Sequence, residues 1–121
     1  MPQAGGDSRK YIIGWLALKP GQGRGFLKVA QAYAAGCRKE DGCIFFEMNQ
    51  SIDDPDVFVV AECFRDAEAH EAHLKRPLFL ETWKHLESIG LNGKFENILA
   101  DAVIADSATF GAGSPAEVDD R

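Results

Sequence analysis

Two ionisable side chains occupy positions that suit acid–base chemistry. Glu62 lies in the segment VFVVAECF (57–64), where strand alternation places it on one face with the apolar residues Phe58, Val60 and Phe64. An ionised carboxylate on an apolar face is costly unless it has a partner or a raised pKa. Glu62 is therefore a candidate general base, or the residue that orients one. The alternative is that Glu62 is an acid at the end of a strand. Its carboxylate would then reach solvent or pair with an arginine at an interface.

His73 is the second candidate. It follows Ala69 by four residues in the segment AEAHEAHL, so the two share a helix face and the small Ala69 leaves room for a ligand. A neutral imidazole there can take a proton from a phenol near pH 7. The alternative is a core histidine that bonds a backbone carbonyl. His70 is expected at the rim or on the surface, and nothing around His85 supports a role.

Further residues are candidates for substrate binding. Glu47 and Asn49 share a face of the segment CIFFEMNQS, where they would line a cleft or form bonds across a dimer. Four aromatic residues are candidate walls for an aromatic substrate, although such residues also build ordinary cores. They are Phe46, Phe64, Phe79 and Trp83.

The composition limits the class of protein. With 121 residues, 45% of them hydrophobic and 26% charged, the chain is expected to form one globular domain with a packed core. A net charge of -6 and the lack of a Lys/Arg cluster argue against a nucleic-acid partner. No apolar run approaches the roughly 20 residues that span a bilayer, and the segment MPQAGGDSRK lacks the apolar core of a signal peptide. A cytoplasmic protein is expected.

Cysteine and histidine spacing does not favour a metal site. Cys37, Cys43 and Cys63 are an odd number without CxxC spacing, and we expect them to be reduced and buried. The HEAH motif does not have the zinc-binding HExxH spacing. The glycine-rich stretch GQGRG lacks the residues of a phosphate loop and is expected to be a connector.

The elements that must position these side chains follow from hydrophobic patterns. Strands are predicted for residues 10–19, 43–51, 57–64 and 94–105, and helices for 26–37, 67–74 and 78–88. Asp66 is the predicted cap of the second helix, and Pro77 separates it from the third. The predicted domain spans residues 10–105. Residues 1–9 and 106–121 are expected to be flexible tails, in which Phe110 is the residue suited to dock on a partner subunit.

The order β-α-β-β-α-β predicts an α+β, ferredoxin-like fold, in which helices cover one face of a four-stranded antiparallel sheet. The first strand is apolar on both faces, since Ile12 and Leu16 alternate with Ile13 and Trp15. The uncovered sheet face would therefore expose aromatic residues to water, and exposed patches of this size mark interfaces. We expect a homodimer in which two sheets pack face to face.

The segment EDGCIFFEMNQSIDDPDVFVVAECFRDAEAHEAHLKRPLF (40–79) resembles the antibiotic biosynthesis monooxygenase (ABM) family. The resemblance extends over residues 10–105, and Phe64 departs from it where many members carry Trp. It implies a dimeric α+β barrel, often a small oxygenase that acts on quinol-like or polyketide aromatics without metal or flavin. The elements that carry it are Gly42-Cys43, Phe46-Glu47, Asp54-Pro55, Glu62, Ala69, His73, Pro77 and Phe79.

These observations lead to a cofactor-independent monooxygenase as the main hypothesis. His73, oriented or assisted by Glu62, would remove a proton from a phenolic or quinol-like substrate, and the anion would react with molecular oxygen. Two alternatives stay open, because proteins that share this resemblance include an isomerase and members without an established reaction. One is an isomerase that uses the same base; the other is a dimeric ligand-binding or stress module without catalysis.

Overall fold

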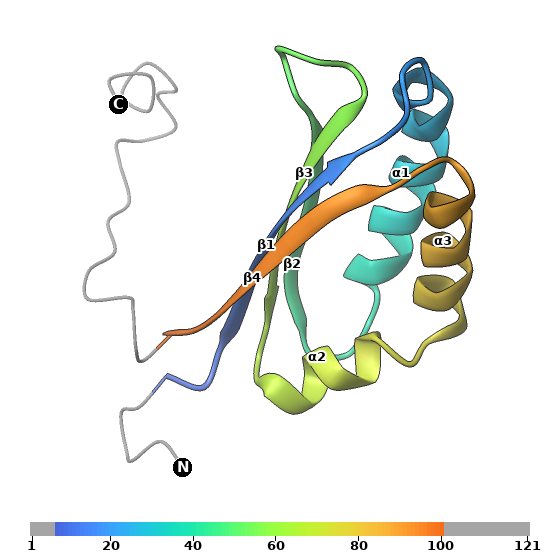
Figure 1. The fold of residues 1–121 in the computed structure, drawn as a ribbon. Helices are drawn as coiled ribbons and strands as arrows, with labels where there is room; N and C mark the ends of the chain where they lie inside the picture. Colours follow the sequence, from blue (N-terminus) through green and yellow to red (C-terminus); the bar gives the residue numbers. More distant parts are fainter. Residues whose placement is uncertain (1–6, 101–121) are drawn as a thin grey trace, which may run out of the picture.

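Four antiparallel strands form one sheet, and three helices cover one of its faces (Figure 1). The computed structural model describes residues 7–100. The strand order β2-β3-β1-β4 confirms the predicted α+β, ferredoxin-like fold. The strands are β1 (Lys10–Ala17), β2 (Cys43–Gln50), β3 (Val57–Phe64) and β4 (Asn92–Leu99). The helices are α1 (Gly23–Arg38), α2 (Ala67–His73) and α3 (Pro77–Ser88).

Helix α1 begins three residues earlier than its apolar pattern predicts, because the turn between β2 and β3 caps it. The Asp56 carboxylate accepts hydrogen bonds from the backbone N–H groups of Gly23 at 2.8 Å and Gly21 at 3.0 Å. A Cβ atom on Gly23 would lie 1.7 Å from the Pro55 carbonyl oxygen, so only glycine fits there. Part of the predicted GQGRG connector is therefore the first turn of a helix.

The other boundaries agree closely with the sequence pattern. The Asp66 carboxylate accepts a hydrogen bond from the Ala69 N–H at 2.8 Å, as predicted for the cap of α2. Pro77 occupies the first turn of α3, where its missing N–H costs nothing. Strand β4 begins two residues earlier than predicted and ends at Leu99. Residues 101–105 of the predicted strand and Phe110 lie outside the described residues.

The strand register decides which side chains face the helices. Ile12 of β1 pairs with Glu62 of β3 on one side and with Asn97 of β4 on the other, so all three share the inner face. The outer face carries Tyr11 and Trp15 of β1. None of the helices within residues 7–100 covers this outer face, so it corresponds to the uncovered apolar face that the sequence predicted (Figure 1).

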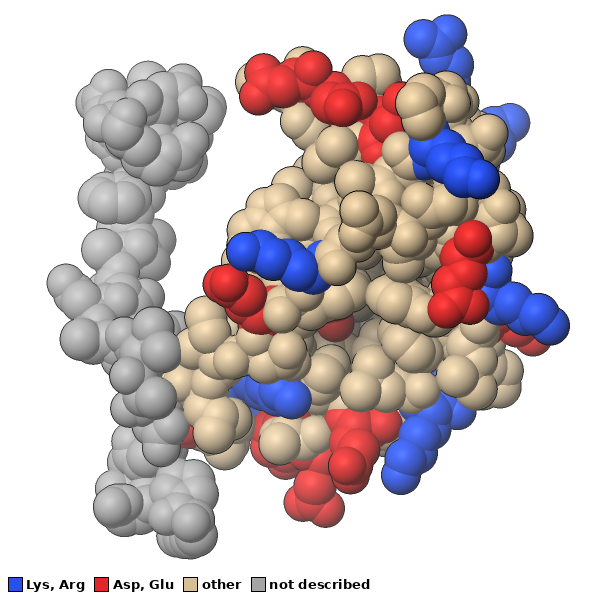
Figure 2. Space-filling model, in the orientation of Figure 1, with Lys and Arg blue, Asp and Glu red and all other residues tan. Residues whose placement is uncertain are grey.

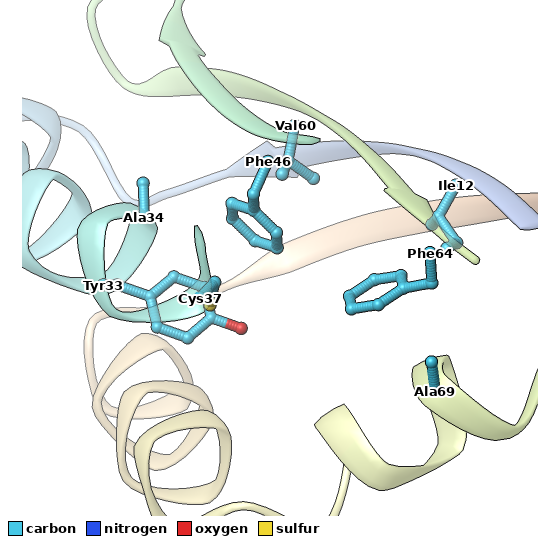
Figure 3. Close-up of a cluster of buried hydrophobic side chains, with 8 residues drawn as sticks. All are labelled: Ile12, Tyr33, Ala34, Cys37, Phe46, Val60, Phe64 and Ala69. Atoms are coloured by element: carbon cyan, nitrogen blue, oxygen red, sulfur yellow. The ribbon is translucent and has the colours of Figure 1, made fainter. Parts of the chain in front are cut away.

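Two clusters of buried side chains fill the space between the sheet and the helices. The apolar cluster consists of Leu16, Leu18, Phe26, Ala30, Phe58 and Leu86. The mixed cluster, near α2, consists of Ile12, Tyr33, Ala34, Cys37, Phe46, Val60, Phe64 and Ala69. Figure 3 shows Tyr33 of α1 facing Phe46 of β2, with ring centroids 5.4 Å apart. Polar side chains enter the interior beside this mixed cluster.

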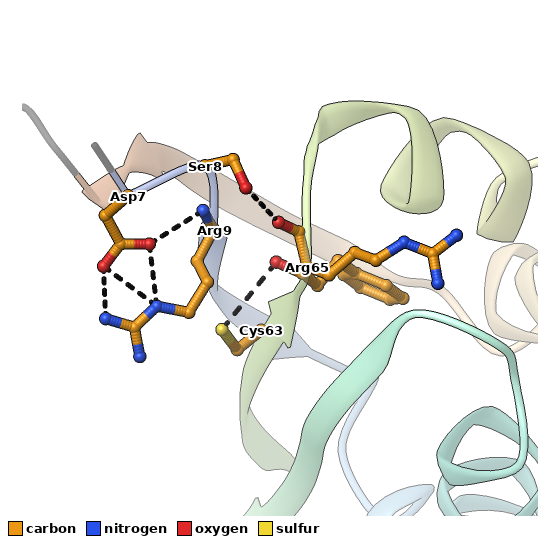
Figure 4. Close-up of polar contacts among 6 residues, drawn as sticks. Asp7, Ser8, Arg9, Cys63 and Arg65 are labelled. Atoms are coloured by element: carbon orange, nitrogen blue, oxygen red, sulfur yellow. Dashed lines mark hydrogen bonds and ion pairs between the residues drawn. The ribbon is translucent and has the colours of Figure 1, made fainter. Parts of the chain in front are cut away.

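The start of β1 is tied to the end of β3 (Figure 4). The Ser8 hydroxyl donates to the Arg65 carbonyl at 2.8 Å, and the Arg9 side chain pairs with Asp7. The Ala100 N–H donates to the Arg9 carbonyl at 2.9 Å, which joins the end of β4 to the same point. These bonds fix the end of the sheet that lies beside α2.

Within residues 7–100, none of the helices has the length and apolar character that crossing a membrane requires.

Candidate active site

A cavity of about 530 Å³ lies between the inner sheet face and the helices α2 and α3. It brings together Glu62 and His73, the two residues that the sequence singled out. On the face shown in Figure 2, basic and acidic side chains are interspersed around a largely uncharged centre. The lining residues are Lys10, Ile12, Glu62, Ala67, His70, Glu71, His73, Leu74, Phe79, Trp83, Phe95 and Asn97.

His73 is held by a buried carboxylate. Its Nδ1 atom lies 3.0 and 3.1 Å from the two carboxylate oxygens of Glu40, which follows the C-terminus of α1. The side chains of His73 and Glu40 are only 2% and 5% exposed, and Arg76 Nε lies 3.6 Å from Glu40 Oε1. Because a carboxylate accepts but does not donate, Nδ1 carries the proton in this arrangement. The Nε2 atom then presents a lone pair and can accept a proton.

The Nε2 side of His73 faces two oxygen atoms. The Tyr33 hydroxyl lies 3.4 Å away, and Glu62 Oε1 lies 4.0 Å away. Burial raises the pKa of Tyr33, so the hydroxyl remains protonated at neutral pH. Aromatic rings enclose the imidazole, with those of Phe64 and Phe79 at centroid distances of 5.2 and 5.3 Å. The base therefore sits in an environment with little water.

Glu62 is 6% exposed, and its Oε1 atom has no hydrogen-bond partner among the described residues. Burial raises the pKa of Glu62 to about 7, and the nearby charge of Glu40 adds to the shift. A carboxyl group with such a pKa exchanges protons near neutrality. A ligand hydroxyl in the cavity would supply the partner that the buried oxygen lacks.

The two histidines of α2 differ in their surroundings. Burial lowers the pKa of His73, and the Glu40 carboxylate opposes that shift. Burial also lowers the pKa of His70, to about 4, and the Lys10 charge adds to the effect. His70 is buried and lines the cavity, so of the two expected positions, surface or rim, the surface one does not apply. Both imidazoles are neutral at pH 7.

Cys37 adds a third ligand-type atom beside Glu40 and His73, and the three atoms lie within 4.8 Å of one another. The sequence spacing gave no sign of this cluster. A metal ion would need the thiolate, but burial raises the pKa of Cys37 to about 12. The Nδ1 atom of His73 is already bound to Glu40. The residues therefore suit a hydrogen-bonded network better than a metal site.

The predicted aromatic walls divide between cavity and core. Phe79 and Trp83 line the cavity with stacked rings 5.7 Å apart. Phe46 lines a second, smaller pocket that shares Phe79 and Trp83 with the cavity. Phe64 is fully buried against His70 and His73 and belongs to the core.

Glu47 and Asn49 do not line this cavity. Strand alternation turns Phe46 and Met48 toward the helices, so Glu47 and Asn49 are on the outer face. Glu47 is exposed and lies 3.5 Å from an Arg38 nitrogen. They are therefore not part of the cavity that holds Glu62 and His73, and the alternative, bonds across a dimer, stays a prediction.

Several residues at the site were not anticipated from the sequence. Glu40 and Tyr33 contact His73, and neither is near it in the chain. Phe95 and Asn97 line the cavity from β4, where the alternation in KFENIL places them on one face. That alternation was a usable signal for the β4 pair. Glu40 reaches His73 only through the tertiary fold, which brings the chain after α1 close to the end of α2.

Comparisons with known proteins indicate the family and the fold of the chain. A family model described as antibiotic biosynthesis monooxygenase matches residues 11–85. No functionally curated protein matches the chain.

Three solved structures illustrate the likeness in fold. A Pseudomonas aeruginosa protein is 26% identical over 76% of this chain and 93% of its own, with a TM-score of 0.70. A candidate antibiotic biosynthesis monooxygenase from Deinococcus radiodurans is 19% identical over 86% and 99%, with a TM-score of 0.71. SnoaB from Streptomyces nogalater, described as a cofactor-independent oxygenase, is 16% identical over 82% and 99%, with a TM-score of 0.69.

Proposed function

The chain belongs to the antibiotic biosynthesis monooxygenase family, and on that premise we propose that it is a cofactor-independent monooxygenase of phenolic or quinol-like small molecules. The observation that carries the proposal is that His73 and Glu62 line one cavity with aromatic walls, where Glu62 Oε1 lies 4.0 Å from His73 Nε2 and has no hydrogen-bond partner within residues 7–100. SnoaB, a protein of similar fold, is described as a cofactor-independent oxygenase. The fold alone does not determine the reaction, so the proposal depends on the site.

The site supplies a base and a surface for the substrate ring. The ring packs against Phe79 and Trp83, and its hydroxyl group enters between Glu62 and His73. His73 Nε2 accepts the hydroxyl proton because Glu40 holds the proton of Nδ1. Glu62 in its protonated form donates a hydrogen bond to the same oxygen, which stabilises the developing phenolate. The enclosing aromatic rings keep water from protonating the resulting anion again.

The phenolate anion is the reductant in the oxygen step. It transfers an electron to O2, and the two radicals join through a carbon–oxygen bond at a ring carbon that bears hydrogen. Loss of that hydrogen as a proton and cleavage of the O–O bond give a quinone and water. The overall reaction is phenol plus O2 to quinone plus water, so the substrate supplies all the electrons. The proton on His73 leaves with the hydroxide.

Oxygen consumption by the purified, metal-free protein with a panel of hydroquinones and naphthols tests this proposal. We expect uptake that falls by roughly 100- to 10,000-fold in His73→Ala, the usual loss when a general base is removed. His85→Ala removes an exposed imidazole from α3 and should leave uptake unchanged. His73→Asn keeps more of the side-chain volume and guards against misfolding. Lack of uptake with every compound, or uptake that persists in both His73 variants, would overturn the proposal.

We also propose that two copies pair through the outer sheet face. Trp15 and Phe45 are each 37% exposed there, and the ring centroids of Tyr11 and Phe45 lie 6.0 Å apart. Apolar faces of this kind are buried in assemblies. Light scattering should give a dimer mass for the wild type and a monomer mass for Trp15→Glu. The control Leu80→Glu places the same charge on an exposed apolar residue of α3 and should remain dimeric. A monomeric wild type would refute the pairing.

A further inference from the structure

The cavity contains a cation that the proposed proton transfer does not use. Lys10 begins β1, lines the cavity and is only partly exposed. It is the single Lys or Arg among the cavity-lining residues of the described chain. The ion pairs formed within residues 7–100 do not include it. An ammonium group that lines a cavity and forms no direct ion pair with the described residues is available to pair with an anionic ligand.

The sheet register gives the backbone spacing between Lys10 and Glu62. Ile12 is opposite Glu62, and Lys10 is opposite Phe64, so Lys10 and Glu62 are diagonal neighbours on the inner face. Such neighbours have Cα atoms about 7–8 Å apart. An aromatic ring that meets Glu62 at one end can therefore present a substituent to the Lys10 ammonium at the other.

The other ionisable groups around the cavity leave the Lys10 charge available. His70 is neutral at pH 7, since its pKa is lowered to about 4. Glu71 is exposed on α2, where water screens its charge. Glu40 is behind His73 and does not line the cavity. Glu62 is the remaining acid. The Lys10 charge lowers the pKa of Glu62 against the larger effect of burial, but the two side chains form no direct ion pair.

We propose that the site selects aromatic compounds that carry an acidic group, such as a carboxylate, which pairs with Lys10 while the ring hydroxyl meets Glu62. This inference rests on the proposed function and adds a substrate class to it. A charge-assisted bond to a partly exposed ammonium should favour the acidic compound by about tenfold in affinity, which corresponds to about 1.4 kcal/mol. The preference should weaken as salt is added.

Binding without turnover measures this preference directly. We would titrate the protein anaerobically at pH 7 with 2-naphthol and with 6-hydroxy-2-naphthoate, using calorimetry. The wild type should bind the naphthoate about tenfold more tightly. Lys10→Met, which keeps the length and apolar stem of the side chain, should bind both compounds with the affinity of naphthol. The control Lys84→Met removes an exposed charge from α3 and should keep the preference.

Equal affinities for the two compounds in the wild type, or no measurable binding of either, would overturn the inference. A preference that survives in Lys10→Met would overturn it as well. The binding experiment and the oxygen-uptake experiment can give different answers. Tight, Lys10-dependent binding without oxygen uptake would support the inference and refute the reaction, whereas uptake with neutral quinols and no preference for acids would do the reverse.

Discussion

The two ends of the interior share β3 but differ in their helices and in their chemistry. The apolar cluster joins β1, β3, α1 and α3 through residues such as Phe26 and Phe58, whose rings meet edge to face at 5.2 Å. The end beside α2 contains Glu62, His70 and His73, all buried. One end therefore gains stability from close packing, and the other gives up some of that stability to hold ionisable groups away from water.

The difference between the two ends shows how a small domain can stay folded while it holds buried ionisable groups. A buried, unpartnered carboxyl group such as Glu62 destabilises the folded state when it is ionised. The apolar cluster lies at the opposite end of the helices and compensates for that cost. If this division is correct, substitutions at the apolar end should change stability without changing the chemistry, and substitutions at the α2 end should change mainly chemistry and pH dependence.

The largest effect on stability is expected at the apolar end. Phe26→Ala removes a side chain that is 1% exposed and should lower the free energy of unfolding by about 3–5 kcal/mol. Leu27→Ala, at the neighbouring exposed position of α1, should cost less than about 1 kcal/mol. Urea unfolding at pH 7 measures both. If Phe26→Ala lowered the free energy of unfolding by less than about 1 kcal/mol, the apolar end would not be the main source of stability.

The next effect concerns the pH dependence of stability. Burial raises the pKa of Glu62 to about 7 from its ordinary value of 4.5, so the folded state prefers the protonated group. The favourable contribution is complete below pH 4.5 and is lost as the pH rises to about 7. Two and a half pKa units correspond to about 3 kcal/mol. Glu62→Gln cannot ionise and should be about that much more stable than the wild type at pH 8.

This prediction uses the difference between the two proteins because another group acts in the opposite direction. His70 has a lowered pKa, so acid below about pH 6.5 destabilises the folded state through that residue. His70 is present in both proteins, and its contribution cancels. Chemical unfolding at pH 4.5 and pH 8 gives the difference. Equal stabilities of Glu62→Gln and the wild type at pH 8 would show that the Glu62 carboxylate is solvated or paired.

Much of the fold was predictable because local patterns specify it. The strand 57–64 and the capped helix after Asp66 have the residues that their geometry requires, and both form as predicted. Glu62 and His73 meet at the cavity because one is on the inner face of β3 and the other on the inner face of α2. Each of those faces can be deduced from its own periodicity.

The rest of the site depends on contacts between distant segments. Glu40 is 33 residues from His73 and follows a helix whose angle to the sheet is set by packing. Which of the two alternatives for Glu47 and Asn49 applies could not be decided from the sequence for a related reason. Alternation shows that they share a face but not which face the helices cover, and Phe46 takes the inner one. Pairing across the fold cannot be deduced from the periodicity of one segment.

The smallest of the three effects is expected from Glu40→Gln, which leaves His73 in place but removes the charge behind it. The amide is neutral and can turn its NH2 group toward Nδ1, which would favour the other tautomer and protonate Nε2. The expected loss of oxygen uptake is roughly 10- to 100-fold, in the range seen when partners that orient a histidine are removed. Because Glu40 raises the pKa of His73, that pKa should also fall in the variant.

Nitrogen NMR of the His73 ring separates a positioning role from simple structural support. In the wild type, Nδ1 should carry the proton and Nε2 should be unprotonated, whereas Glu40→Gln should populate the Nε2–H form. Glu40→Asp restores the charge and should recover part of the uptake. Glu68→Gln, on the exposed side of α2, should change neither the spectrum nor the activity. A wild-type spectrum with the proton on Nε2 would contradict the role of Glu40, because the lone pair would then face away from the cavity.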